Sequence, residues 1–151
     1  MLNWFRKKPR SLQELTDEQL KWSVARVSDQ DGDLFLRYTS DKALVAHPEL
    51  PWRLGVAIEH SFENQRREMI DPLYNEIEDR LLELLAGPPR CGLFVLALRN
   101  ERMVEWICYC QGDAAARRIA GILGDAYGDN GICAMGADDP NWEIFREYTP
   151  R

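Results

Sequence analysis

Two neighbouring carboxylates near the C-terminus are the residues whose type and spacing best suit chemistry. Asp138 and Asp139 begin the segment Asp-Asp-Pro-Asn-Trp, which ends at Trp142. Paired carboxylates can hold a metal ion or act as general acid and base. In the alternative, Asp139 caps a turn or short helix while Trp142 fills one end of the core. Because adjacent side chains often point apart, we expect capping and packing here.

A histidine could extend such a site. His60 is in register with the alternating apolar residues that begin at Trp52, so it should end the buried face of a strand. A catalytic base needs a nucleophile within reach, and the sequence names none. The G-x-S-x-G, P-loop and dinucleotide-binding patterns are also missing from the sequence. We therefore expect no catalytic residues and a hydrogen-bonded structural role for His60.

Three acidic residues alternate at a predicted turn. Asp29, Asp31 and Asp33 resemble a small calcium loop, because alternate carboxylates can converge on one cation. An EF-hand also needs a later bidentate Glu, which does not stand at the required offset. Gly32 can adopt the positive φ of a hairpin turn, where acidic residues favour local hydrogen bonds. We expect a hairpin rather than a cation site.

The four cysteines favour ordinary packing over metal or redox chemistry. Cys91, Cys108, Cys110 and Cys133 form no C-x-x-C pair, and neither histidine has a finger-like spacing from them. Reduced thiols that pack as small apolar side chains are usual in cytosolic proteins. We expect buried free cysteines, no bound metal and no cofactor.

Charge is distributed unevenly along the 151 residues. The first ten residues hold four of the 19 Lys and Arg residues and none of the 25 acidic ones, so the rest has 15 basic against 25 acidic residues. An acidic body repels phosphate backbones, which proteins grip with clustered Lys and Arg. We therefore expect no nucleic acid to bind the folded body. A protein partner with a basic surface fits the charge better.

The sequence also predicts a cytoplasmic protein. The longest apolar stretches, such as residues 93–98, are far shorter than the roughly 20 residues of a membrane span. The basic N-terminus is not followed by the apolar run of a secretory signal. Residues 1–20 are expected to form a basic arm and a short helix near 11–19, because Ser11 and Glu14 have capping-box spacing.

Hydrophobic periodicity predicts one α+β domain over residues 21–151. Two strands, 22–27 and 34–38, form an N-terminal hairpin. From residue 52 to about 137 the order is strand, helix, strand, strand, helix, strand, which is the βαββαβ plan of a ferredoxin-like core. Its first helix should start at Asp71 and Pro72 and end at Gly87. Residues 138–148 should contain a short helix or turn.

Two short segments carry a family resemblance. They are His47-Pro48-Glu49-Leu50-Pro51-Trp52 and Asp138-Asp139-Pro140-Asn141-Trp142-Glu143-Ile144-Phe145-Arg146-Glu147-Tyr148-Thr149-Pro150. Together they resemble the bacterial family known as domain of unknown function 695. Members are sometimes fused to, or share the fold of, the regulator of ribonuclease activity B, which inhibits ribonuclease E. The resemblance implies the fold, names no catalytic residues, and leads us to expect no fused second domain in this chain.

These observations favour a non-enzymatic interaction or regulatory module. Its acidic surface or a sheet edge would bind another protein, and exposed strand edges also allow a homodimer. The alternatives are a metal-assisted hydrolase built on the carboxylates and a small-ligand sensor. The candidate binding residues are His47, Trp52, His60, Asp138, Asp139 and Trp142.

Overall fold

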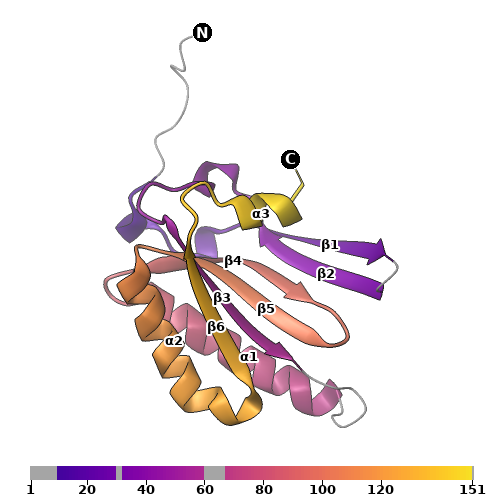
Figure 1. Ribbon diagram of the computed structural model, residues 1–151. Helices are drawn as coiled ribbons and strands as arrows, with labels where there is room; N and C mark the ends of the chain where they lie inside the picture. Colours follow the sequence, from indigo (N-terminus) through magenta and orange to yellow (C-terminus); the bar gives the residue numbers. More distant parts are fainter. Residues whose placement is uncertain (1–9, 30–31, 60–66, 151) are drawn as a thin grey trace.

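The computed structural model describes residues 10–29, 32–59 and 67–150, which fold around a six-stranded sheet (Figure 1). The strands are β1 (Trp22–Asp29), β2 (Gly32–Thr39), β3 (Trp52–Glu59), β4 (Gly92–Arg99), β5 (Met103–Cys110) and β6 (Ile132–Asp138). Their order in the sheet is β1-β2-β4-β5-β3-β6, and all neighbours are antiparallel. The helices are α1 (Arg67–Ala86), α2 (Asp113–Tyr127) and α3 (Glu143–Tyr148). The predicted α+β class is confirmed.

The N-terminal strands form a hairpin that extends the sheet. Gly32 has a φ of +111°, a value that suits glycine at a turn. β2 pairs with β4, from Phe35 opposite Arg99 to Tyr38 opposite Leu96. β4 therefore lies inside the sheet, while β1 and β6 form its two edges.

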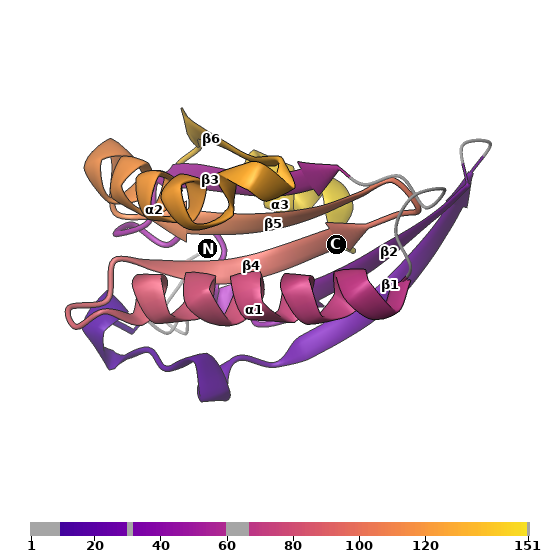
Figure 2. The same cartoon turned by 90° about the horizontal axis from the view of Figure 1, so that it is seen from below.

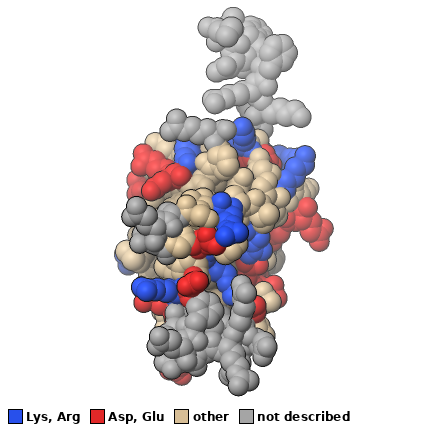
Figure 3. Space-filling view, turned by 90° about the vertical axis from the view of Figure 1, so that its right-hand side faces the viewer, with Lys and Arg blue, Asp and Glu red and all other residues tan. Residues whose placement is uncertain are grey.

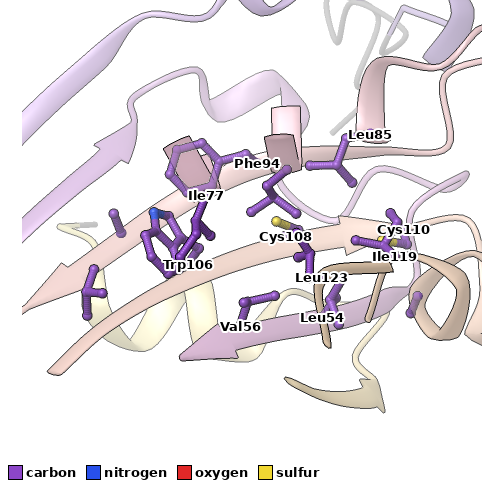
Figure 4. Close-up of a cluster of buried hydrophobic side chains, with 14 of the residues drawn as sticks. Leu54, Val56, Ile77, Leu85, Phe94, Trp106, Cys108, Cys110, Ile119 and Leu123 are labelled. Carbon is purple, nitrogen blue, oxygen red and sulfur yellow. The ribbon is translucent and has the colours of Figure 1, made fainter. Parts of the chain in front are cut away.

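α1 and α2 cover one face of the sheet, called the helix face below (Figure 2). Apolar residues recur along α1 at helical spacing, and Ile77, Leu81 and Leu85 of this stripe are fully buried. Figure 4 shows this core, where the helices meet Leu54, Val56, Phe94, Trp106, Cys108 and Cys110 of the sheet. Among the described residues, no helix combines the length and apolar character needed to cross a bilayer.

The opposite face is covered by the N-terminal segment, the loop over residues 40–51 and α3. Their buried side chains are Leu12, Leu15, Leu20, Leu44, Leu50, Trp142 and Phe145. They pack against Leu93, Val95, Leu96, Leu98, Ile107 and Tyr109 of β4 and β5. β4 is consequently buried from Gly92 to Leu98. The apolar sequence of this strand predicts such two-sided burial, which the structure confirms.

The helix predicted over residues 11–19 is wrong. Two 3₁₀ turns, Leu12–Glu14 and Asp17–Gln19, occupy this segment. The Gln13 side chain exchanges two hydrogen bonds, both of 2.9 Å, with the backbone of Arg90. The hydroxyl of Ser11 caps no turn. Contacts to a distant segment therefore outweigh the local capping signal.

α1 begins earlier than predicted. The helix starts at Arg67 and encloses Pro72, whereas the sequence predicts Asp71 as the N-cap and Pro72 as the first helical residue. The Asp71 carboxylate pairs with the Arg99 guanidinium on β4. Pro72 removes one N–H from the helical ladder, a cost that the buried stripe through Ile77 and Leu81 offsets.

Two glycines give opposite stability predictions. A Cβ at Gly92 would lie 2.7 Å from both Leu85 Cδ2 and the Tyr109 carbonyl oxygen, whereas a Cβ at Gly124 of α2 would meet open space. Gly92→Ala should lower the free energy of unfolding by about 1–3 kcal/mol through overpacking. Gly124→Ala should raise it by about 0.5–1 kcal/mol, because alanine loses less backbone entropy in a helix. Urea unfolding measures both, and a destabilising Gly124→Ala would contradict this packing.

Candidate functional site

Asp139 stands at the centre of a buried hydrogen-bond network where β6 meets α3. Its Oδ1 accepts from the backbone N–H of Glu143 at 2.8 Å. Its Oδ2 accepts from the Tyr109 hydroxyl at 2.7 Å, and from the Arg53 guanidinium and the Ile144 N–H at 3.4 Å. Only 5% of the Asp139 side chain is exposed. The carboxylate therefore caps α3 and ties it to β3 and β5.

Trp142 fixes the same corner through its ring. The indole N–H donates to the Leu50 carbonyl at 2.9 Å, which fastens the loop before β3. The ring stacks on Tyr109 with a centroid separation of 4.3 Å and an interplanar angle of 10°. Phe145 meets it edge-on at 5.7 Å. Trp142 is fully buried and packs as an aromatic anchor.

The network holds its two central groups, Asp139 and Tyr109, in different protonation states. Burial alone would raise the pKa of Asp139, but bonds from the Glu143 N–H, the Tyr109 hydroxyl and the Ile144 N–H, with the Arg53 charge, hold the pKa below its usual value. Burial and the bond to Asp139 raise the pKa of Tyr109. Tyr109 therefore remains a protonated donor and Asp139 an ionised acceptor, which suits a structural clamp.

His47 clamps the N-terminal segment. Its Nδ1 accepts from the Glu49 N–H at 3.1 Å, so Nε2 carries the proton and donates to the Arg10 carbonyl at 2.7 Å. The Glu49 carboxylate accepts from the Leu12 N–H at 2.7 Å. With 2% exposure, His47 has no surface to offer a ligand.

Trp52 and Asp138 lie opposite each other in β3 and β6, on the helix face. The Trp52 ring packs against Gly136, where an added Cβ would come within 2.7 Å of its Nε1. Among the described residues this buried Nε1 has no hydrogen-bond partner. Asp138 is exposed. Because successive side chains of a strand alternate between faces, Asp138 and Asp139 point apart.

The six candidate residues do not form one site. Two lie on the helix face, three support the opposite face, and His60 lies outside the described residues. Within the described part of the chain, no three His, Cys, Asp or Glu side chains are placed to hold a metal ion. The geometry gives no support to a shared metal or proton site at Asp138 and Asp139.

Two hollows on the surface avoid these residues. A groove of about 820 Å³ lies between α3 and the end of β2, and its lining mixes acidic Asp41, Glu143 and Glu147 with basic Lys42 and Arg146. A pocket of about 330 Å³ lies between the hairpin and α1. Its two arginines pair with carboxylates, Arg37 with Glu78 and Arg99 with Asp71. Neither hollow therefore favours a ligand of one charge.

No described strand pairs with the outer edge of β6. The Asp139 N–H donates to the Pro51 carbonyl at 2.8 Å. Because bonded and non-bonded pairs alternate along an antiparallel ladder, the backbone groups facing away from β3 belong to Ile132, Ala134, Gly136 and Asp138. Within the described residues, β6 pairs with β3 alone. Charged residues and proline are the usual protections of an edge. In β6 the one charged residue, Asp138, is the last of the strand, and the segment from Ile132 to Ala137 contains neither a charge nor a proline.

The other edge, β1, is protected. The backbone carbonyl of Lys21 accepts from the Ser40 N–H at 2.8 Å. Because bonded and non-bonded pairs alternate along the ladder, the backbone groups of Val24 and Arg26 face away from β2. Arg26 sits within this strand and pairs with Asp33 at 2.5 Å. A charged side chain at an edge discourages pairing with another strand.

Three of the four cysteines fit the sequence prediction. Cys91, Cys108 and Cys110 are buried free thiols, and burial raises the pKa of Cys110 to about 12. Cys133 is exposed, which corrects the expectation of burial. It lies on β6 opposite Ala57, on the face away from α1 and α2, where no described segment covers the sheet margin.

Sequence reasoning missed Arg53, Tyr109 and Glu105. Glu105 Oε1 reaches over Gly55, 3.1 Å from where a Cβ would stand. Burial raises the pKa of Glu105, and the Arg53 charge partly offsets this. The alternation of Arg53 with apolar residues marks it as facing away from the helices, but its partners depend on strand order.

No protein-family model matches the chain, and no curated protein matches it either.

Asp139→Asn should lower the free energy of unfolding at pH 7 by about 1–3 kcal/mol, because buried donors lose a charged acceptor. The folded-state pKa lies below the ordinary 3.8, so the carboxylate's contribution is complete above that value. The contribution is lost as the pH falls through the lowered folded-state pKa. Urea unfolding between pH 7 and about pH 2 should show wild-type stability falling more steeply than that of the variant.

Asp138→Asn is the matched control, since the neighbouring carboxylate is exposed. Its free energy of unfolding should stay within about 0.5 kcal/mol of wild type. Equal losses from the two substitutions would contradict the clamp role of Asp139.

Proposed function

We propose that this chain is a non-catalytic protein-interaction module and that the outer edge of β6 is its contact element. The observation that carries the proposal is the row of outward backbone groups at Ile132, Ala134, Gly136 and Asp138. Backbone N–H and C=O groups pair with a strand in extended conformation. Proteins recognise extended segments in this way, by adding a strand to an exposed sheet edge.

The edge supports the proposal better than a charged surface does. On the face in Figure 3, acidic and basic side chains are interspersed instead of forming a patch of one sign. Six residues of β6, from Ile132 to Ala137, are uncharged. Binding through this edge should therefore depend weakly on salt, whereas an acidic surface would lose its partner as salt rises.

We further propose that residues 52–137 form a ferredoxin-like core related to domain of unknown function 695 and the regulator of ribonuclease activity B. Support comes from the order β3, α1, β4, β5, α2, β6 and from the sheet order β4-β5-β3-β6. Both helices pack on one face, as this plan requires. The four free cysteines agree with the cytoplasm as the expected location.

The proposal is tested by two proline substitutions at opposite edges. The N–H groups of Ala134 and Val24 both face away from their neighbouring strand, so proline removes no bond within the sheet. Tagged wild-type, Ala134→Pro and Val24→Pro chains are used for capture from the source lysate, supplemented with untagged chain, at low and moderate salt. Wild type and Val24→Pro should retain a stoichiometric partner, and Ala134→Pro should lose it.

Circular dichroism and thermal melting check that both variants keep the fold. A partner retained by Ala134→Pro would place the contact elsewhere and contradict the use of β6. Wild-type chain that retains neither another protein nor its own untagged copy would contradict an interaction module altogether.

A further inference from the structure

We propose that the β6 edge pairs with the β6 edge of a second copy of this chain, antiparallel, with a two-fold axis at Met135. This inference rests on the proposed use of the β6 edge and names its partner. The two sheets would become one continuous sheet across the axis. The contact is isologous, so both copies use the same residues and the assembly closes as a dimer.

The backbone fixes the register. New hydrogen bonds can only join residues whose backbone groups face outward, and these are Ile132, Ala134, Gly136 and Asp138. With the axis at Met135, Ala134 of one copy lies opposite Gly136 of the other, and Ile132 lies opposite Asp138. All seven residues of β6 are then paired. Moving the axis to Ala134 or Gly136 leaves strand ends unpaired, so the Met135 register satisfies the most backbone groups.

The side chains suit the same arrangement. Met135 is 74% exposed on the face away from α1 and α2. The two-fold axis places the Met135 side chains of the two copies side by side on this face. Cys133 would lie opposite Ala137 on that face. On the helix face Ala134 lies opposite Gly136, a pair too small to clash, and Ile132 lies opposite Asp138. No like charges meet between Ile132 and Ala137.

Area and charge set the strength of the contact. A pair of seven-residue strands is about 24 Å long, so it buries less than the roughly 800 Å² per partner of a standard interface. We therefore expect a micromolar dissociation constant.

Each copy has a net charge of −6, and salt screens the repulsion between the two copies. Dimerisation should hold or strengthen as salt rises, which separates it from binding driven by opposite charges.

Analytical ultracentrifugation over a concentration series is the first test. Wild type and Val24→Pro should shift from monomer to dimer as concentration rises, while Ala134→Pro stays monomeric. Wild-type chain that stays monomeric at millimolar concentration would overturn the inference. The wild-type chain could stay monomeric and yet capture a different protein that Ala134→Pro does not capture. That result would support β6 as the contact element and would contradict only the second copy as its partner.

Cysteine substitutions test the register. Residues at the axis form a non-hydrogen-bonded pair with Cα atoms about 4.5 Å apart, within the range that a disulfide spans. Met135→Cys in a Cys133→Ser background should therefore give a disulfide-linked dimer under mild oxidation. Ala137→Cys with native Cys133 should also link, because positions 133 and 137 oppose each other.

Ala137→Cys in the Cys133→Ser background is the matched control. Position 137 is then far from its own copy, so the linked fraction should fall at least about tenfold. The buried Cys91, Cys108 and Cys110 cannot interfere at the surface. Equal linkage in all three variants would show random collision and overturn the proposed register.

Discussion

The clamp between Asp139, Tyr109 and Trp142 is the interaction on which the second layer of this protein depends. Asp139 caps α3 and accepts from Tyr109 of β5, while Trp142 stacks on Tyr109 and bonds to the loop at Leu50. Through these few contacts, α3 and the loop before β3 are held on the face that α1 and α2 leave open. That cover buries β4 on both sides and makes the sheet centre an apolar layer.

The same clamp determines what remains free. The clamp commits Asp139 to bonds within the fold, and a separate pair of hydrogen bonds to Arg10 and Glu49 commits His47. The cover ends before β6, whose Met135 side chain stays exposed. Within the described residues, no strand pairs with the outer edge of β6, and its segment Ile132–Ala137, unlike β1, carries no charge. We therefore propose the sheet edge, and not a pocket of side chains, as the contact element.

Periodicity was sufficient to predict the α1 stripe, the alternating strand β3 and the two-sided burial of β4, because each pattern is local. The role of Asp139 as a cap also follows from its place before Pro140. The sequence does not predict its partners Tyr109 and Arg53, because they depend on which strands lie side by side. The edge position of β6 could not be predicted for the same reason. The expected helix over 11–19 failed because Gln13 bonds to Arg90, far along the chain.

Amide hydrogen exchange along β6 tests the central claim most directly. The outward N–H groups of Ala134 and Gly136 are compared with that of Val24, at the other edge, as the protein concentration rises. We predict that exchange at Ala134 and Gly136 slows by at least about tenfold while Val24 is unchanged, because only β6 gains a strand partner. Exchange at Ala134 and Gly136 that stays fast at every concentration would show an unused edge and contradict the account.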